Sequence, residues 1–409
     1  MIFRYVVSCP GCDSKILLRI SVGIEIEQPF YFVCKKCNVA TRGKQVIWYQ
    51  PTPGARIDLE DGIRLDDTTP HDQVVSINPD YPTLPETKSL METNGSSFLM
   101  YHALLGNKFE EFKNRYDHFN SCINSDWQAV RRLIYYYLDR NWEQFDKQGK
   151  NILEDKFPKS VSEMHRHDLM HRLLSIMFAP LCTELYYPEM KENWNNTFNQ
   201  AIVNANEELE RYLNAISVDE LIDIQRNLFH CLELFVKYKG AIMPGLVTDM
   251  NPDNKIKKKL RLFRDEFPAL RDLYISTFEA CHKTLHYLMA IVNIAFRKDQ
   301  NKFGPNGPSN LKKFEKLPNA KKADCLRDLD VWDKYWKSLL DRDIRNAIGH
   351  HSVRHNLTTG KLVIKNKEPI PYLDFVVMNL RLVYPIQACA DAIKIFFIAL
   401  SIRNNKMKP

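Results

Sequence analysis

The amino-acid sequence predicts a mainly α-helical fold with a small N-terminal β region, a helical middle region and a C-terminal helical bundle that carries a short β-hairpin. Residues 1–50 contain runs of β-branched and aromatic residues separated by turn-forming positions, which is typical of short strands. From Phe98 onward, apolar residues recur at three- and four-residue steps, as in helices. With 409 residues, 44% of them apolar, the chain is long enough for two or three globular domains.

Two CxxC pairs lie in turns between the predicted strands of residues 1–50. They are Cys9-Pro10-Gly11-Cys12 and Cys34-Lys35-Lys36-Cys37, separated by 21 residues. Two thiolates from each turn can complete a closed tetrahedral shell, so the spacing predicts a zinc ribbon with a structural and non-catalytic Zn ion. The alternative is a pair of disulfides or a redox pair. The chain lacks secretory features, and the pairs lack the βαβ context that a redox site needs.

Residues 51–97 have a different composition, with many prolines and acidic clusters. We expect a Pro-rich acidic linker there, with one hairpin at residues 57–65 because Asp61-Gly62 is a turn signal. The middle region, residues 98–250, should follow as helices. The predicted ranges are 127–153 after Ser125-Asp126, a helix opened by Ser160 or Ser162, 194–213 and 218–239.

Residues 255–403 should form the C-terminal domain. The pattern predicts a long helix from Pro268 to Phe296, a loop, a helix over 327–349, a hairpin over 357–370 and a last helix over 372–402. Its first part, residues 255–322, carries 16 Lys or Arg against 6 Asp or Glu, although the net charge of the whole chain is only +7. This stretch could attract phosphates, and the alternative is an ordinary solvated face.

The chain has no apolar N-terminal core followed by a small-residue cleavage site, so we expect no secretory signal. The most apolar stretch, residues 382–402, contains Pro385, Asp391 and Lys394, which a membrane span would rarely tolerate. The expectation is a cytoplasmic protein with no membrane association. Glycine-rich phosphate loops and the HExxH and GxSxG motifs are missing from the sequence, which counts against an ATPase, a dehydrogenase, a zinc protease and a serine hydrolase.

The end of the predicted helix 327–349 carries Arg345-Asn346-Ala347-Ile348-Gly349-His350. This segment resembles the Arg-[polar]-x-x-x-His signature of the HEPN superfamily (higher eukaryotes and prokaryotes nucleotide-binding domain). The order of elements over residues 255–403 is similar too. The resemblance implies a metal-independent endoribonuclease that leaves 2′,3′-cyclic phosphate and 5′-hydroxyl ends. It also implies pairing into a homodimer or higher oligomer, and a role as an antiphage or toxin effector controlled by a phage-derived or antitoxin regulator.

The residue types suit that chemistry without a catalytic cofactor. Histidine is the side chain that changes charge near neutral pH, so His350 can act as base or acid, while Arg345 can bind non-bridging phosphate oxygens. Asn346 could orient either partner. We expect Gly349 to end the helix in the left-handed conformation, so that His350 turns back towards Arg345.

A second Arg-x4-His pair, Arg166 and His171, also fits the signature. The sequence predicts that its helix continues past His171, which places the two side chains about 140° apart, so we interpret this pair as structural. It could also belong to a second, degenerate HEPN-like unit.

Other residues near the signature have open assignments. His351, Arg354 and His355 either contact RNA or form a polar turn. His282 and His286 could bind a metal with Cys281, although an ordinary helix face or core edge is the favoured interpretation.

Two other function classes remain open. In the first, the helical domain is a non-catalytic dimerisation or nucleotide-binding module, with a ribbon that binds nucleic acid or a partner, and Arg345 and His350 only cap and hydrogen-bond. In the second, the ribbon belongs to a DNA-binding regulator. This second class is disfavoured because no clear recognition helix lies beside the ribbon.

Overall fold

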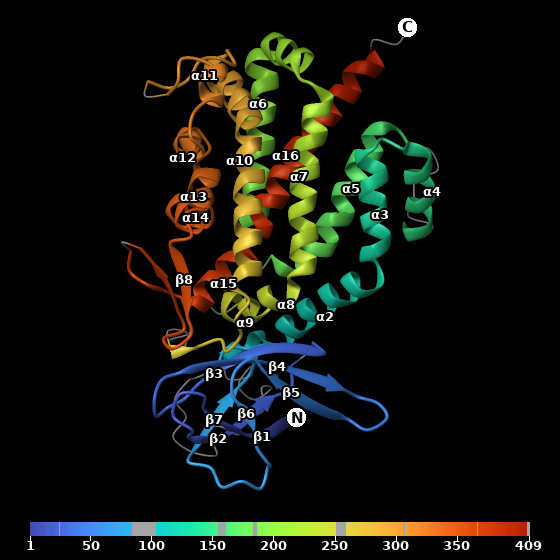
Figure 1. Cartoon of the computed structure of the whole chain (residues 1–409). Helices are drawn as coiled ribbons and strands as arrows, with labels where there is room; N and C mark the ends of the chain where they lie inside the picture. Colours follow the sequence, from blue (N-terminus) through green and yellow to red (C-terminus); the bar gives the residue numbers. More distant parts are fainter. Residues whose placement is uncertain are drawn as a thin grey trace. The chain divides into compact units, whose positions relative to one another are not determined.

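The computed structural model describes the chain except residues 24, 84–103, 154–160, 183–185, 251–258, 306, 366 and 407–409. It divides into two compact units, each assembled from separate segments. Unit 1 contains Met1–Asn114, Tyr238–Asp272 and Asn346–Leu380, and unit 2 contains Arg115–Lys237, Leu273–Arg345 and Arg381–Pro409. The predicted mainly α architecture with an N-terminal β region is confirmed (Figure 1).

Two sheets make up the β region of unit 1. One has the order β6-β1-β2-β7 and the other β3-β4-β5. All neighbours are antiparallel except β2 and β7, which are parallel. The strands are β1 (Ile2–Ser8), β2 (Lys15–Ser21), β3 (Glu27–Val33), β4 (Ala40–Trp48), β5 (Gly54–Leu59), β6 (Ile63–Arg64) and β7 (Gln73–Ile77).

The predicted linker over residues 51–97 is wrong for residues 54–77, because three strands from this stretch complete the two sheets. The turn at Asp61-Gly62 exists, and Gly62 has φ 104°. The strands on either side of it do not pair with each other, since β5 joins β4 and β6 joins β1. The predicted hairpin is therefore also wrong. Residues 84–97 lie outside the described part of the chain.

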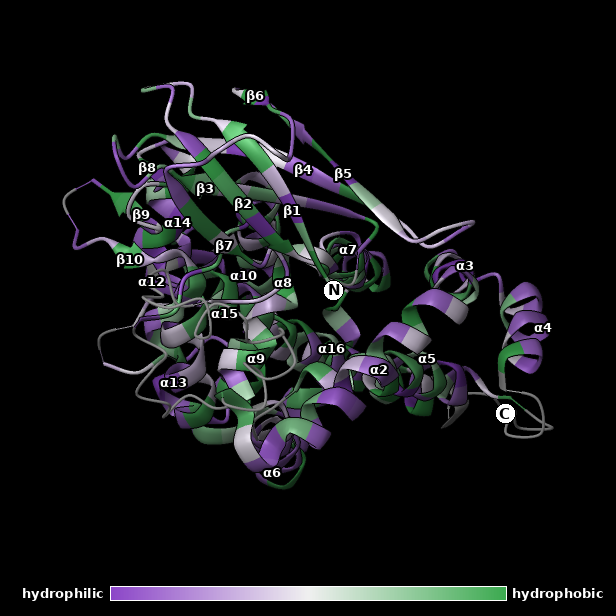
Figure 2. Cartoon of the chain, turned by 90° about the horizontal axis from the view of Figure 1, so that it is seen from below, coloured by the Kyte–Doolittle hydropathy of each residue, from purple (hydrophilic) through white to green (hydrophobic). Residues whose placement is uncertain are grey.

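The β region has its own apolar core. Buried side chains of β1 and β2 meet those of β3, including Val7, Leu18 and Phe32. Figure 2 shows hydrophobic residues among hydrophilic ones along these strands. Phe263 and Leu357 join this core from distant parts of the sequence. The backbone N–H of Tyr31 donates to the carbonyl of Phe263 at 3.0 Å, so residues around 263 lie along β3. Long-range pairing of this kind leaves no local sequence signal.

The described part of the basic stretch, from Lys259 onward, is partly neutralised inside unit 1. Arg264 is 3% exposed, and its guanidinium pairs with the carboxylates of Asp80 and Glu25 at 2.7 Å. After α14 (Arg342–Gly349), the hairpin predicted over 357–370 corresponds to β9 (Lys361–Ile364) paired with β10 (Ile370–Pro371). The strand β8 (Val353–Asn356) precedes that range and pairs with β9 on its other side. The remaining helices confined to unit 1 are η1 (Gly106–Lys108), α8 (Lys239–Ile242) and α9 (Pro244–Met250).

Unit 2 is helical. Helix α16 (Val383–Lys406) packs against α5 (Glu163–Phe178), α6 (Tyr186–Ala215) and α7 (Val218–Lys237). The other helices and turns that lie in unit 2, or enter it, are α2 (Phe109–Ser125), α3 (Trp127–Leu138), α4 (Trp142–Leu153), η3 (Ala179–Leu181), α10 (Phe267–Arg297), α11 (Leu311–Glu315), α12 (Asn319–Ala323), η5 (Asp324–Asp328), α13 (Asp330–Leu339) and α15 (Tyr372–Arg381).

Most of the predicted helices are present, but four of them are interrupted. The range 127–153 breaks at Arg140 (φ 52°), and the range 194–213 is kinked at Ala205, which has non-helical backbone angles. The range 327–349 breaks between α13 and α14, and the range 372–402 breaks between α15 and α16. The long helix predicted for Pro268–Phe296 is confirmed as α10. Ser162 starts α5 with a capping box, as one of the two predicted starts.

One helical stretch, Tyr372–Arg403, is long and apolar enough to cross a membrane by length and composition alone. In its most apolar window, 78% is buried inside the protein, as in a core helix. Asp391 and Lys394 within this stretch take part in buried ion pairs of unit 2.

Candidate functional site

The two CxxC turns have nearly the same backbone structure. In the first, the N–H of Asp13 donates to the carbonyl of Cys9 at 3.0 Å, and in the second the N–H of Asn38 donates to that of Cys34 at 2.9 Å. Asp13 and Asn38 both adopt positive φ, 56° and 60°. Aspartate and asparagine tolerate this left-handed conformation better than most residues, so each turn can close immediately after its second cysteine.

The four thiols converge into one cluster that could hold a metal ion. All four sulfur atoms lie within 4.8 Å of one another. The Sγ atoms of Cys9 and Cys37 are 3.5 Å apart, and those of Cys12 and Cys34 are 3.7 Å apart. A tetrahedron of thiolates about 2.3 Å from a central ion has edges of about 3.8 Å, so the residues fit such an ion. None of the four cysteines is in a disulfide.

Neighbouring groups fix this cluster and stabilise negative sulfur. The side-chain amide of Gln73 donates to Cys34 Sγ at 3.2 Å, while its carbonyl accepts from the N–H of Lys35 at 2.8 Å. Burial acts to raise the pKa of Cys34, but the N–H of Cys37 and the Gln73 amide outweigh it and lower that pKa to about 6. Gln73 lies in the supposed linker, so sequence reasoning missed it.

The segment carrying the HEPN-like signature begins at a well-formed helix start. Asp341 Oδ1 accepts from the N–H groups of Asp343 and Ile344 at 2.7 and 3.1 Å, which caps the N-terminus of α14. Arg345 on this helix donates from Nε and Nη2 to one oxygen of Glu279 on α10, at 2.9 and 2.5 Å. Its guanidinium also lies 5.9 Å from the ring centre of Phe278. The side chain stays 36% exposed.

The C-terminus of α14 differs from the prediction. The N–H of His350 donates to Asn346 O at 2.9 Å, so helical bonding continues through Gly349. The left-handed residue is His351 (φ 51°), whose N–H donates to Ile348 O while that of Ser352 donates to Ala347 O. This is a Schellman ending with histidine where glycine is usual. Gly349 does not turn His350 back towards Arg345, and helical geometry places these side chains about 140° apart.

His351→Gly is expected to raise the free energy of unfolding by up to about 1 kcal/mol, because glycine adopts the left-handed conformation without steric cost. Urea denaturation followed by circular dichroism measures the change. His350→Gly is the matched control and should lower stability by about 0.5–1 kcal/mol, because its N–H is bonded as in a helix. Destabilisation by both variants would contradict the assignment of the helix end.

The other predicted residues of this segment lie in different environments. Asn346, His350, His351 and Arg354 are exposed. The His355 side chain is only 2% exposed, donates from Nδ1 to Asp265 Oδ1 at 2.8 Å, and stacks on Tyr372 with ring centres 3.9 Å apart. Its predicted contact with RNA has no support from this buried position. The sequence gives no sign that the His355 side chain is buried while Arg354, just before it, is exposed.

A cavity of about 370 Å³ lies in unit 2, and its lining includes Phe278, the residue next to the Arg345 guanidinium. Its floor is aromatic, since Phe278, His282 and Trp336 are each at most 2% exposed. Polar side chains line the rest of it, among them Lys337, Asp341, Arg342 and Asp343. The sequence analysis did not identify Glu279, Phe278 or Trp336. The spacing of apolar residues along a helix shows which face is buried, but it does not show which distant helix that face contacts.

His282 belongs to this floor and not to a metal site. Its Nδ1 lies 2.7 Å from Phe278 O, and Trp336 Nε1–H donates to its Nε2 at 3.2 Å, so one nitrogen donates and the other accepts. Burial lowers the pKa of His282 to about 4. Among the described residues, the four-cysteine cluster is the group found able to hold a metal. The favoured interpretation of His282 as a core-edge histidine agrees with this.

The neutral His282 makes stability depend on pH. Its pKa is near 6.5 in the unfolded chain and lower in the folded protein, so protons bind the unfolded state more readily. The free energy of unfolding should be at its full value above pH 6.5 and fall as the pH drops towards 4. Urea denaturation at pH 7.5 and 5.0 measures this fall in the free energy of unfolding. The fall should be smaller for His282→Leu than for wild type. The control His230→Leu, at an exposed position, should show the same fall as wild type. Equal falls in all three proteins would contradict this account.

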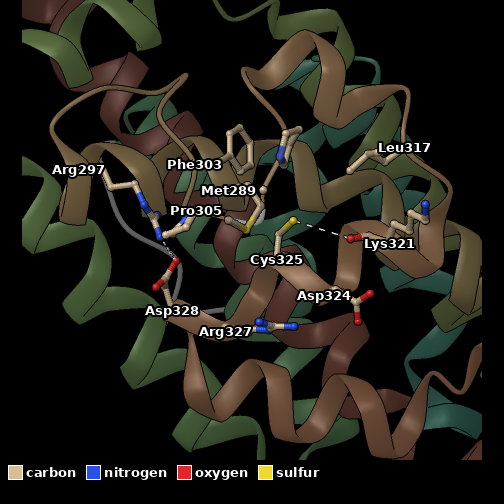
Figure 3. Close-up of a pocket in the computed structure, with 13 residues that line it drawn as sticks. Met289, Arg297, Phe303, Pro305, Leu317, Lys321, Asp324, Cys325, Arg327 and Asp328 are labelled. Carbon is tan, nitrogen blue, oxygen red and sulfur yellow. Dashed lines mark hydrogen bonds and ion pairs between the residues drawn. The ribbon is translucent and has the colours of Figure 1, made fainter.

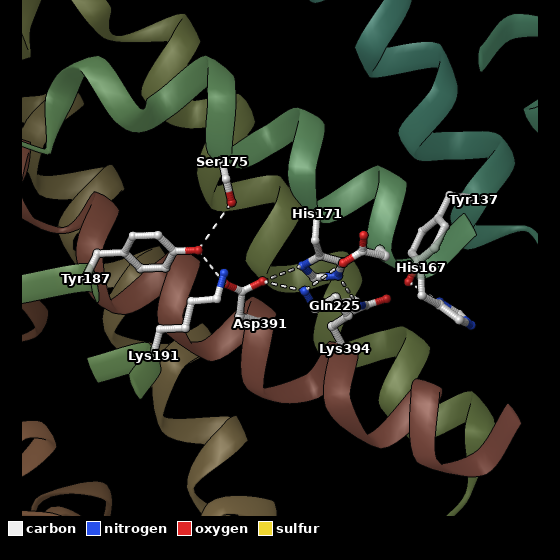
Figure 4. A network of polar contacts seen from close by, with 10 residues as sticks. Tyr137, His167, His171, Ser175, Tyr187, Lys191, Gln225, Asp391 and Lys394 are labelled. Atoms are coloured by element: carbon white, nitrogen blue, oxygen red, sulfur yellow. Dashed lines mark hydrogen bonds and ion pairs between the residues drawn. The ribbon is translucent and has the colours of Figure 1, made fainter. Parts of the chain in front are cut away.

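The second Arg-x4-His pair is structural. Arg166 pairs with Asp146 through Nε and Nη2 at 2.8 and 2.6 Å. His171 is 3% exposed and lies 3.5 Å from Asp391 and 2.8 Å from the amide of Gln225. Figure 4 shows the network around Asp391, which also receives the hydroxyl of Tyr187. Helix α5 continues beyond His171 to Phe178, as expected.

Comparison of this chain with models of protein families, with curated proteins and with solved structures finds no match.

Proposed function

We propose that the protein is an endoribonuclease of HEPN type that cleaves RNA without a catalytic metal. The observation that carries the proposal is the exposure of Asn346 and His350 and the partial exposure of Arg345 on α14 and its last turn, in contrast to the buried His171 of the other pair. These three residues fit the HEPN-like signature in the sequence. Attack by the 2′-hydroxyl would give 2′,3′-cyclic phosphate and 5′-hydroxyl ends.

Arg345 is suited to bind the scissile phosphate. Glu279 takes the Nε–H and one Nη2–H of its guanidinium, which fixes the plane of the group. Three of the five N–H donors remain for non-bridging phosphate oxygens. In the transition state the phosphate carries extra negative charge. A cation that is already fixed beside it lowers the activation barrier, because the cation does not have to move during the reaction.

His350 supplies the proton transfers. It takes the proton of the 2′-hydroxyl or gives one to the leaving 5′-oxygen, and histidine suits both tasks near neutral pH. One side chain cannot be base and acid in the same step. Because the side chains of residues 345 and 350 point about 140° apart on a continuous helix, we infer that a second copy of the chain contributes its own His350. The functional protein would then be a homodimer.

The cavity beside Glu279 and Phe278 is suited to one base of the RNA. Aromatic side chains form its floor, and the carboxylates of Asp341 and Asp343 can accept hydrogen bonds from amino groups of a base. Such bases are accessible in single-stranded RNA and hidden in a duplex. We therefore propose single-stranded RNA, or the loops of folded RNA, as the substrate class.

The ion in the four-cysteine cluster is proposed to be zinc, with a structural role. Four thiolate ligands leave no open position for substrate, and zinc is the usual ion for a tetrahedral sulfur shell. A role against phage or as a toxin, and control by a phage-derived or antitoxin regulator, rest on the resemblance to HEPN proteins alone.

Incubation of the purified protein with total cellular RNA, with and without EDTA, tests the proposal. Cleavage should persist in EDTA, and end-group analysis should find cyclic phosphates and 5′-hydroxyls. Circular dichroism must accompany each sample, because a chelator can remove a structural metal and unfold its domain. Fragments with 5′-phosphates, or cleavage that needs added Mg²⁺ in the folded protein, would contradict the proposed chemistry.

A non-catalytic module is the second candidate. It is favoured by the Glu279 ion pair, which would give Arg345 a structural task, and by the regular Schellman ending at His351. Under this alternative, His350→Ala would leave every RNA-related property unchanged. The decisive experiment uses wild-type protein in molar excess over single-stranded and folded RNA. Binding of both kinds of RNA without cleavage would favour the non-catalytic module.

A further inference from the structure

A second and larger cavity of about 590 Å³ lies in unit 2, where the end of α10 meets the loop after it and the segment α12–η5 (Figure 3). This volume falls in the range of sites for small ligands, roughly 300–1,000 Å³. Its lining includes none of the signature residues 345–350. The proposed cleavage of RNA therefore leaves it without a role.

One part of the cavity wall is apolar. Met289 of α10 is 1% exposed, and Phe303 stacks on Phe314 with ring centres 5.3 Å apart and planes 23° from parallel. Leu317 and two prolines of the loop add to this wall. A Cβ on Gly307 would lie 2.7 Å from the Cβ of Phe303, so the close approach of the loop to that ring requires glycine. A flat ring could lie against this wall.

The other part carries charges that the protein leaves available. Arg297 is fixed by Asn293 Oδ1 at 3.0 Å and by the Asp328 carboxylate. Lys321 and Arg327 are exposed, and within the described residues their charged groups have no hydrogen-bond or ion-pair partner. Residues 297–328 carry 9 Lys or Arg against 4 Asp or Glu, so the surroundings attract anions.

We propose that this cavity binds a nucleoside monophosphate. The ring system would lie against Phe303 and Met289, and the phosphate would pair with Lys321 and Arg327 at the mouth. The exposed Asp324 carboxylate lines the same cavity and can accept hydrogen bonds from ribose hydroxyls. An inorganic anion alone would leave the apolar wall unused, and a neutral apolar ligand would leave the two cations unpaired.

Isothermal titration calorimetry of the full-length protein with AMP, CMP, adenosine and inorganic phosphate tests this proposal. Both monophosphates should bind more tightly than adenosine or phosphate, by at least tenfold. Arg327→Gln and Lys321→Gln should each weaken AMP binding about tenfold, because each removes one charge-assisted contact. Both residues are exposed, so neither change should unfold the protein.

The control is Lys312→Gln, which removes one exposed charge from the same segment but does not line the cavity. It should leave AMP binding unchanged. Gly307→Ala should weaken AMP binding, because its Cβ would lie 2.7 Å from the Cβ of Phe303 and displace that ring at the edge of the cavity. Absence of binding at millimolar AMP, equal affinity for AMP and phosphate, or an equal loss in Lys312→Gln would overturn the proposal. All readouts are binding heats, so a failure of RNA cleavage would not affect them.

Discussion

His350→Ala is expected to lower the rate of RNA cleavage by about 10²–10⁴-fold, the usual contribution of a general acid or base. If two copies of the chain supply the base and the acid, the substitution removes both in a homodimer, so the loss should lie at the upper end of this range. The side chain is exposed after the last helical hydrogen bond of α14. Its removal should therefore change the free energy of unfolding by less than about 0.5 kcal/mol.

The measurement is the initial rate of cleavage of a fluorescent single-stranded RNA by wild type and variant at equal folded concentration. His230→Ala serves as the matched control, since His230 is also exposed on a helix and lies outside the signature. Mixed dimers of wild type and His350→Ala chains should retain less than half of the wild-type rate per dimer if both copies are needed. Full activity of His350→Ala would show that another residue carries the chemistry.

The sequence predicted the elements with strong local signals. The four cysteines, the long helix α10 and the serine cap of α5 follow from spacing, periodicity and capping, which are local properties. The breaks at Arg140 and between α13 and α14 were missed. Neither involves proline or glycine at the break itself, so the apolar pattern continues across it.

Contacts between distant segments could not be predicted. Residues 54–77 were interpreted as an acidic linker because their strands are short and lie among prolines and acidic clusters, yet they pair with β1, β2 and β4. The same limit applies to the candidate site. Position 345 was recognised by its spacing to position 350, whereas its partner Glu279 lies 66 residues earlier on α10 and carries no signature. The left-handed residue was assigned to Gly349 on propensity, while the hydrogen bonds place it at His351.

Cys37→Ser is expected to remove one bound zinc ion per chain and to lower the free energy of unfolding of the β region by more than about 3 kcal/mol. Structural zinc contributes up to about 10–16 kcal/mol in small domains that lack a core of their own. Here the loss should be smaller, because strands such as β2 and β3 also bury apolar side chains against each other. Cys9 and Cys34 belong to that same core, so losing the ion leaves their sulfur atoms inside it without the metal that held them together.

Metal analysis and urea denaturation of wild type, Cys37→Ser and Cys122→Ser measure this effect. Cys122 is a partly buried cysteine outside the cluster, so its variant should keep the zinc and most of the stability. The assignment of a structural zinc site would be contradicted if purified wild type contained no zinc, or if Cys37→Ser still contained one zinc ion per chain. Cd²⁺ should replace zinc and restore the fold, since it also accepts four thiolates. If the ion is structural and RNA cleavage needs none, the cadmium protein will cleave RNA at the zinc protein's rate, whereas a catalytic ion would change that rate.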